Sequence, residues 1–315
     1  MKKKLPIALL IIGFWLPALA QDDLLDIIDE DPKTDQEAIP EIIYTTATFK
    51  GTRIVNMQSP EIPGKGVMQF MFMHRFGAIN DDFFYNFFGL DVASVRLSLD
   101  YSITDWLNVG FGRSSVTKTW DGFLKLKLLR QSTGGRNMPI SAVLYSTVNY
   151  SMLRFDDDLP HKDSDRLSYS YQLILARKFG ERFSFELVPT LVHYNLVQTK
   201  AQPNDVFALG FGGRIKLTKR IALTGEYMLQ MPKNTYYDDV TQAEVAYNDA
   251  LSIGVDIETG GHVFQLHLTN SRGLVDSQWI GRTPGSWNNG DIYLGFNISR
   301  VFTIVRPKTP KEPAW

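Results

Sequence analysis

Residues 102–114 read SITDWLNVGFGRS, and this stretch decides how the chain is interpreted. Apolar side chains occupy alternate positions in its second half, at Leu107, Val109 and Phe111. The positions between them carry an amide or no side chain, at Asn108, Gly110 and Gly112. Alternation with a period of two indicates a β-strand with one apolar face. The strand therefore needs apolar surroundings on one side and space or water on the other.

The same pattern recurs from residue 66 onward. We find twelve alternating segments that end in turn residues. A soluble β-sandwich would also alternate, but here short connectors gather at one end of the predicted strands and long ones at the other, as in membrane barrels with an even strand number. We therefore expect an all-β fold, a transmembrane antiparallel up-and-down β-barrel of about twelve strands over residues 66–305.

The N-terminus is typical of a secreted protein. Residues 1–20 combine lysines with an apolar run that ends in Ala-Leu-Ala, which predicts a signal peptide. The sequence contains no cysteine, which excludes disulfides and thiolate metal sites. We expect the barrel in the outer membrane with both termini periplasmic. Residues 21–60 would form a periplasmic N-terminal segment, and residues 306–315 a periplasmic tail.

Charge limits the partners. Without the three signal lysines the chain has 30 basic residues (33 minus 3) against 34 acidic ones, a net charge of about −4. This balance argues against a nucleic-acid partner. The acidic loop at 155–165 matches no calcium-loop spacing, so we expect neither a metal nor another cofactor. The expected partners are outer-membrane lipid and lipopolysaccharide, a small polar solute, and a periplasmic or surface protein.

The stretch before the first strand suggests an occupant for the barrel interior. Residues 48–56, TFKGTRIVN, mix apolar side chains with Lys50 and Arg53. Glycine inside a strand often marks the close approach of another backbone. The small residues on the predicted inward face are Gly110, Gly112, Ala208, Gly210, Gly212, Ala222, Ala250, Gly254 and Gly295.

We hypothesise that residues 48–56 plug the lumen. In this hypothesis Lys50 and Arg53 pair with inward carboxylates. The candidate carboxylates are Asp100, Glu186, Glu226 and Asp256. The alternative is an open pore in which the small residues serve barrel curvature.

One proline interrupts the strand pattern. Pro189 lies in the middle of FSFELVPTLV, residues 183–192. Because proline has no backbone N–H to donate to a neighbouring strand, we predict a β-bulge at this position.

The predicted inward face carries both signs of charge. Its basic residues are Arg75, Arg96, Lys125, Lys127, Arg214 and Lys216. A pore for one charge class is expected to show a single sign at its constriction. The inward carboxylates include Glu258 as well, and the mixture suggests either salt-bridged packing of the lumen or a weakly selective channel. Of these we expect a channel or binding barrel for small polar solutes. The solute or plug would contact these cations, the four carboxylates named above, Lys50 and Arg53.

Two other functions are compatible with a barrel. One is a closed structural or docking barrel that engages a partner through its loops or tails. The other is a lipid-modifying enzyme that uses His74 or His193 on the outward face. Because no histidine lies in a recognisable nucleophile motif, we expect no enzyme and name no catalytic residue.

Five stretches together carry a family resemblance. They are TFKGTRIVN (48–56), HRFG (74–77), GFGRS (110–114), GSWNNGD (285–291) and FNISRVF (296–302). With them the chain resembles an uncharacterised family of Gram-negative outer-membrane β-barrel proteins, over roughly residues 46–302. The resemblance implies a barrel in the outer membrane and supplies no established activity, ligand or catalytic residue.

Overall fold

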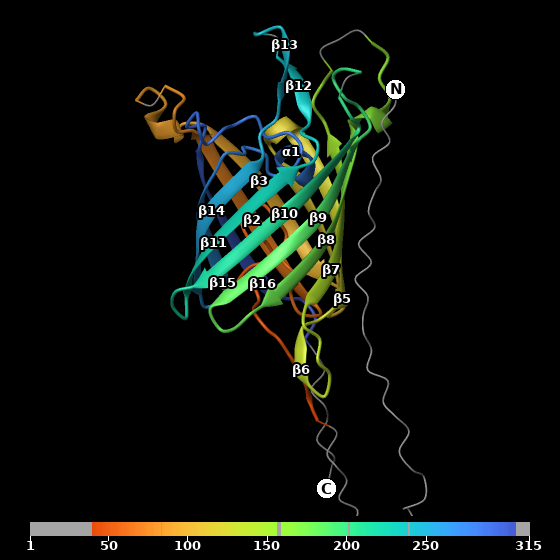
Figure 1. Ribbon diagram of the computed structural model, residues 1–315, viewed down its shortest axis with the longest axis vertical. Helices are drawn as coiled ribbons and strands as arrows, with labels where there is room; N and C mark the ends of the chain where they lie inside the picture. Colours follow the sequence, from red (N-terminus) through yellow and green to blue (C-terminus); the bar gives the residue numbers. More distant parts are fainter. Residues whose placement is uncertain (1–39, 83, 156–158, 201, 239, 307–315) are drawn as a thin grey trace, which may run out of the picture. The chain divides into compact units, whose positions relative to one another are not determined.

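The strands join edge to edge around a complete ring (Figure 1). The computed structural model describes residues 40–306 except 83, 156–158, 201 and 239. Twelve antiparallel strands close into a barrel, in the order β10-β11-β14-β15-β16-β2-β3-β4-β5-β7-β8-β9. The predicted fold is confirmed. The predicted signal peptide, residues 21–39 and residues 307–315 lie outside the described part of the chain.

The barrel spans Val67–Thr303. Its strands are β2 (Val67–Ala78), β3 (Ala93–Ser102), β4 (Leu107–Ser114), β5 (Thr119–Leu129), β7 (Ser141–Ser151), β8 (Leu167–Lys178), β9 (Phe183–Tyr194), β10 (Asp205–Lys216), β11 (Ile221–Gln230), β14 (Ala250–Thr259), β15 (His262–Thr269) and β16 (Tyr293–Thr303). Two small sheets lie outside the ring, formed by β1 (Ile42–Tyr44) with β6 (Ser132–Gly134) and by β12 (Thr235–Asp238) with β13 (Ala243–Ala246). The single α-helix of the described residues is α1 (Asp276–Trp279), and short 3-10 turns lie at Phe87–Gly89, Val116–Lys118 and Asp163–Arg166.

Apart from the connectors 115–118 and 130–140, connector length distinguishes the two ends of the barrel. We call the end with the turns 103–106, 179–182, 217–220 and 260–261 the short-turn end, and the opposite end the long-loop end. The β12–β13 hairpin and α1 lie at the long-loop end, at the top of Figure 1, and β6 lies at the bottom. No helix in the described residues is long and apolar enough to cross a membrane.

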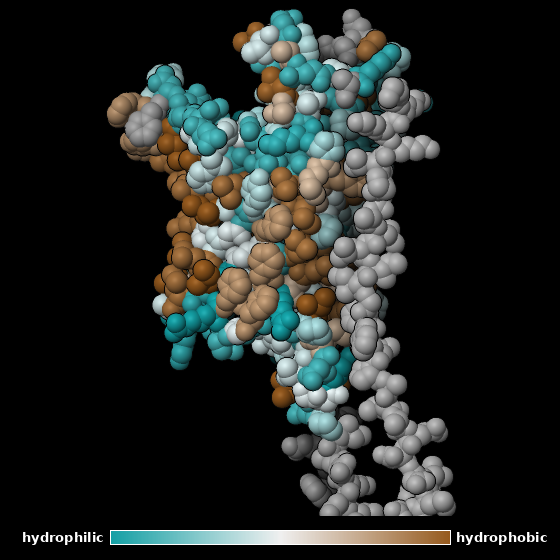
Figure 2. Space-filling view, in the orientation of Figure 1, coloured by the Kyte–Doolittle hydropathy of each residue, from teal (hydrophilic) through white to brown (hydrophobic). Residues whose placement is uncertain are grey.

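The strands turn their apolar faces outward. Phe111 is 56% exposed, whereas Asn108 and Gly112 on the other face of β4 are buried. Figure 2 shows the result on one face of the barrel, where apolar residues form a band between hydrophilic residues at the two ends. A soluble monomer rarely exposes a continuous apolar surface of this extent, but hydrocarbon chains require one.

The predicted bulge at Pro189 is wrong. β9 and β10 pair in unbroken register through Pro189 opposite Leu209. On its other side, β9 keeps the same register with β8 but skips the pairs at Leu173 and Ile174. The missing N–H therefore interrupts the pairing of β9 with β8 near Pro189, without the extra residue that a β-bulge requires. The register shifts of the barrel lie elsewhere, in β5–β7 and β16–β2.

Candidate functional site

A segment from before the first barrel strand lies inside the barrel. Residues 48–60, which we call the lumen hairpin, reach the interior from the short-turn end. Ile54 donates its backbone N–H to Met57 O at 2.9 Å, and Ser59 donates to Thr52 O at 3.0 Å, so the chain reverses at residues 54–57. The four residues of this turn are fully buried. The sequence hypothesis named residues 48–56, the first part of this hairpin, as the occupant of the lumen.

One carboxylate holds the tip of the hairpin. Glu226 on β11 accepts the backbone N–H groups of Val55 at 3.0 Å, Asn56 at 2.9 Å and Met57 at 2.9 Å. It also accepts the side-chain amide of Asn56 at 2.9 Å. Successive backbone N–H groups in a turn form a concave site for an anion, and hydrogen bonds to a charged acceptor are the stronger kind.

Amide side chains of the wall bind the carbonyl groups of the same turn. Gln265 on β15 donates to Arg53 O at 3.0 Å and to Ile54 O at 2.7 Å. Asn297 on β16 donates to Val55 O at 2.9 Å. The turn is therefore bound through its donors and its acceptors, as buried backbone groups require.

Two cations that the sequence placed in the lumen contact the hairpin. Lys125 on β5 donates to Thr52 O at 3.2 Å, to Gln58 Oε1 at 3.3 Å and to Glu61 O at 2.8 Å. Arg75 on β2 donates to Asn56 Oδ1 at 2.7 Å. Both side chains are fully buried, so these contacts compensate for the loss of water.

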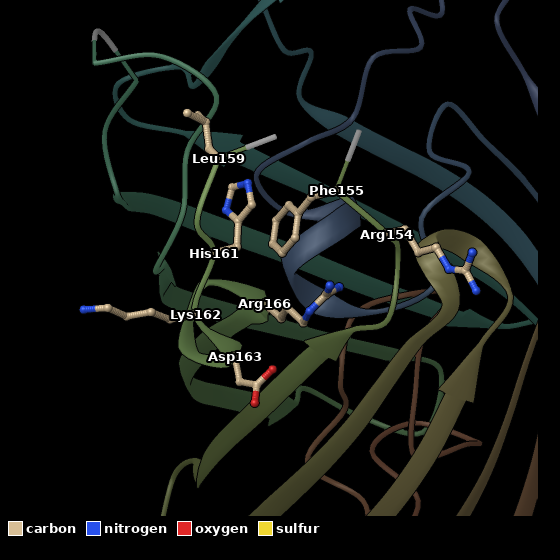
Figure 3. A pocket seen from close by; sticks show the side chains of 7 residues that line it. All are labelled: Arg154, Phe155, Leu159, His161, Lys162, Asp163 and Arg166. Atoms are coloured by element: carbon tan, nitrogen blue, oxygen red, sulfur yellow. The ribbon is translucent and has the colours of Figure 1, made fainter. Parts of the chain in front are cut away.

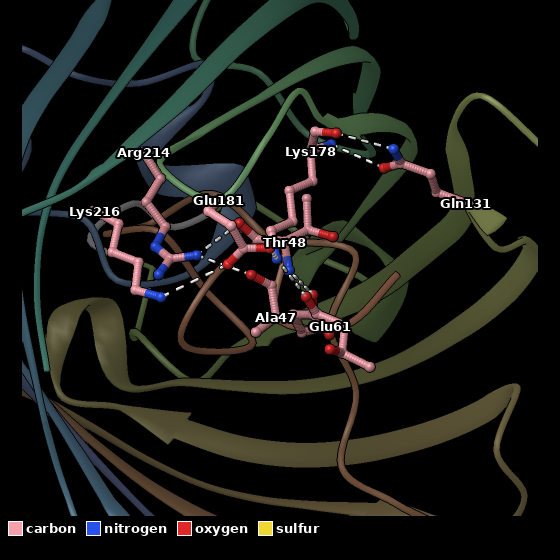
Figure 4. Close-up of polar contacts among 9 residues, drawn as sticks. Ala47, Thr48, Glu61, Gln131, Lys178, Glu181, Arg214 and Lys216 are labelled. Carbon is pink, nitrogen blue, oxygen red and sulfur yellow. Dashed lines mark hydrogen bonds and ion pairs between the residues drawn. The ribbon is translucent and has the colours of Figure 1, made fainter. Parts of the chain in front are cut away.

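A third cation holds the segment where it passes into the barrel (Figure 4). Arg214 on β10 donates to Ala47 O at 2.9 Å and to Thr48 O at 3.1 Å. Thr48 in turn donates its N–H to Glu61 Oε1 at 2.8 Å, which joins the two stems of the hairpin. Lys216 lies at this rim, 4.0 Å from Glu181.

Lys50 pairs with an inward carboxylate as predicted, but neither hairpin cation pairs with one of the four carboxylates named as examples. Lys50 pairs with Glu258 at the end of β14, and Arg53 donates to Asn56 O within the hairpin at 2.8 Å. Glu226, expected to bind a cation, binds the backbone instead, because the turn presents its N–H groups to β11.

The remaining predicted lumen residues divide into paired and unpaired groups. Arg96 pairs with Asp121 at 2.5 Å, and Asp256 accepts from Gln265 at 3.0 Å. Lys127 is half-buried on β5. Neither carboxylate oxygen of Glu186 has a hydrogen-bond partner among the described residues, and the same holds for Oδ1 of Asp100.

Only some of the small residues on the inward face lie against the lumen hairpin. A Cβ on Gly210 would lie 2.7 Å from Met57 Sδ, and one on Gly212 would lie 2.6 Å from Met57 Cε. The other glycines on this face make room for the wall itself. A Cβ on Gly112, for example, would lie 2.6 Å from Arg96 Nη2. The expectation that all the small residues serve one occupant is therefore too broad.

A long loop closes the lumen from the other end, which the sequence analysis missed. In the connector between β15 and β16, Leu274, Trp279 and Ile280 are buried. Trp279 and Ile280 belong to the same apolar cluster as Val55 and Met57 of the hairpin. The available signal was two apolar pairs, Leu274–Val275 and Trp279–Ile280, in a connector that was expected to face water.

Two further contacts fix this inward loop, residues 270–283. Tyr145 on β7 donates its hydroxyl to Asp276 Oδ2 at 3.0 Å, and Tyr194 on β9 donates to Ser277 O at 2.5 Å. Burial raises the pKa of Asp276 above its ordinary value, although Arg53 and Arg96 oppose this shift.

The outer surface offers a pocket and two histidines. The pocket lies in the β7–β8 connector, where the rings of Phe155 and His161 stack and Arg166 lies 4.4 Å over Phe155 (Figure 3). His74 stacks on Phe296 with 5.0 Å between ring centroids, and His193 pairs with Asp205 at 2.7 Å. No serine hydroxyl is among the described hydrogen-bond partners of either histidine, and the lumen, which binds a separate chain segment, is the stronger candidate site.

Comparison with known proteins places the chain in a family. A family model described as "Membrane bound beta barrel domain" (DUF5777) matches residues 49–302. The comparison with curated proteins finds no match.

Several solved barrels are similar in fold. The NanC porin is 7% identical, with a TM-score of 0.47, over 74% of this chain and 98% of that one. An outer membrane channel from Pseudomonas putida F1 is 14% identical, with a TM-score of 0.44, over 77% of this chain and 97% of that one. Outer membrane phospholipase A from Escherichia coli is 10% identical, with a TM-score of 0.40, over 74% and 89%. Likeness at this level says nothing about a solute or a reaction in this chain.

Proposed function

Because this chain belongs to the DUF5777 family of membrane-bound β-barrel domains, we propose that it is a gated outer-membrane channel for small polar solutes, closed at rest by the lumen hairpin. In this proposal both termini are periplasmic, and outer-membrane lipid and lipopolysaccharide surround the apolar band. The hairpin is the gate, and the side chains that bind it become the walls of the passage when it leaves.

The binding of the hairpin by the wall is the observation that carries the proposal. Eight strands give a barrel that its own side chains can fill, whereas larger barrels enclose cavities or channels. Here twelve strands enclose a separate chain segment. Polar groups such as Glu226, Lys125 and Gln265 bind that segment beside the apolar cluster of Val55 and Met57, and water can hydrate these polar groups after release. The vacated lumen would therefore be hydrated.

The mixed charges of the wall suit a polar solute without a strong preference for one sign. Arg75, Lys125 and Arg214 line the same lumen as Glu186 and Glu226. Such a lumen orients dipolar or zwitterionic molecules rather than selecting one type of ion.

The test is conductance in planar bilayers. The mature chain is compared with a variant in which residues 48–60 are replaced by a glycine-serine linker of equal length. We expect rare openings in the first and frequent discrete conductance steps in the second. Circular dichroism and resistance to unfolding by detergent establish that both are folded. A folded linker variant without conductance would overturn the proposal.

One observation favours a closed docking barrel as the second candidate. β1 and its partner β6 project at the short-turn end, and Ile43 on β1 is 62% exposed. An exposed strand with apolar side chains suits pairing with a periplasmic protein. This function predicts that the linker variant stays electrically silent and that substitution of Ile43 by aspartate abolishes co-purification of a partner.

A further inference from the structure

Given the proposed channel, we infer that the solutes it binds are short peptides, because the lumen wall supplies hydrogen-bond partners for both the N–H and the C=O groups of the hairpin's main chain. The inference rests on the proposed function and adds the class of solute. Every peptide carries the N–H and C=O groups concerned, whatever its side chains.

The wall provides separate partners for the two kinds of main-chain group. Glu226 accepts the three consecutive N–H groups of residues 55–57. The carbonyls of residues 47, 48, 52–55 and 61 accept hydrogen bonds from the side chains of Arg214, Lys125, Gln265 and Asn297. These donors and the acceptor come from five strands, so the pattern is a property of the lumen and not of one loop.

The side-chain contacts of the turn are mostly apolar, since Ile54, Val55 and Met57 pack in one buried cluster with wall residues. Ile54 and Met57 fit against the bare backbone of Gly210 and Gly212. Asn56 is the exception, since it contacts Arg75, Glu226 and Ser252. The site therefore favours a peptide with a small polar residue at the turn and tolerates varied apolar residues beside it.

A row of inward positions adds a preference for charge. Glu186, Gly212 and Glu226 lie opposite one another on β9, β10 and β11. A Cβ on Gly212 would lie 2.8 Å from Glu186 Cγ and would also contact Ile54 Cδ1. Glu186 is fully buried, and neither of its carboxylate oxygens has a hydrogen-bond partner among the described residues. A lysine in the place of Ile54 would bring an ammonium group to this carboxylate, so we infer that peptides with a basic residue before the turn bind best.

The experiment uses the linker variant in planar bilayers and measures the block of its current by added peptides. The first probe has the sequence of residues 48–60. The second has alanine at every position except Asn56 and Pro60. The third has the natural sequence with N-methyl groups on the backbone at residues 55–57, which removes the backbone hydrogen bonds to Glu226 and keeps that of the Asn56 side chain. The fourth has lysine in the place of Ile54.

We expect the first two probes to block at concentrations within about threefold of each other and the lysine peptide to block at a lower concentration. The N-methylated peptide should need at least about tenfold more. Glu226→Gln in the linker variant should weaken the block by a similar factor, whereas Asp205→Asn, on the outer face, should leave it unchanged.

The outcomes separate the two proposals. If the linker variant conducts but only the natural sequence blocks, the hairpin is a dedicated gate and the peptide inference is wrong. If it conducts and no peptide blocks, the inference is again wrong while the channel stands. If the folded variant does not conduct, the proposed channel itself fails.

Discussion

Glu226 and Asn56 are joined twice: Oε1 of the carboxylate accepts both the backbone N–H and the side-chain amide of Asn56, each at 2.9 Å. The two residues are 170 positions apart in the sequence. The second carboxylate oxygen binds the N–H groups on either side of Asn56. The reversal of the hairpin is therefore held at one point of the barrel wall, and its release should depend on that point.

Glu226→Gln should loosen the hairpin tip. Glutamine keeps the shape but loses the charge and one acceptor oxygen, and a hydrogen bond to a charged group is worth about 1.5–3 kcal/mol. We expect hydrogen exchange of the amides at residues 55–57 to accelerate by about tenfold or more. Glu186→Gln is the matched control, because the same change is made on a carboxylate that does not bind the hairpin. Equal acceleration in both variants would contradict the assignment.

Gly212→Val should displace the lumen hairpin from its contact with β10. The new side chain would collide with Ile54 and Met57, and overpacking of this kind costs about 1–3 kcal/mol. We expect more frequent channel openings. Gly213→Val is the control on the next position, since a Cβ there has no atom within 4 Å. Similar opening frequencies in the two variants would show that Gly212 is not a contact point.

Lys125→Met should free the hairpin stem. The substitution leaves Gln58 Oε1 and Glu61 O without their donor, and an unsatisfied buried acceptor costs about 1–3 kcal/mol. Trypsin should then cut after Lys50 and Arg53 several times faster, as mass spectrometry of the fragments would reveal. Lys127→Met, two positions along β5, is the control. Trypsin should cleave this variant at the same rate as the unmodified chain. Protection of both sites in Lys125→Met would refute this role.

The inward loop should be more stable at low pH. Burial raises the pKa of Asp276, so the folded loop favours the neutral carboxyl more than the open loop does. This advantage is complete below the ordinary aspartate pKa of about 4 and declines as the pH rises through the raised value. Hydrogen exchange at residues 276–280, corrected for the intrinsic rate, should therefore accelerate with pH.

Asp276→Asn tests the origin of that pH dependence. The variant should show corrected exchange that no longer changes with pH, whereas Asp163→Asn in the exposed β7–β8 connector should retain the change. A persistent pH dependence in Asp276→Asn would assign it to another group.

The sequence predicted which residues face the lumen but not which atoms they bind there. Lys125, Arg214 and Glu226 were assigned to the lumen because each occupies the polar phase of a strand. Their partners were not predictable, since Glu226 binds N–H groups that any residue provides. Gln265 and Asn297 stand in the same phase but were overlooked in favour of charged residues, although neutral amides bind carbonyls equally directly.

By itself the sequence determined the barrel and the apolar and polar faces of its strands. Alternation with a period of two is a local property of each strand's sequence and does not depend on distant contacts. Only the tertiary structure decided that residues 48–60 and the inward loop fill the lumen, which carboxylate binds a backbone and which cation pairs with Glu258. These outcomes depend on which residues of twelve strands meet at one depth of the barrel. That meeting is set by strand register around the closed ring, which local patterns leave open.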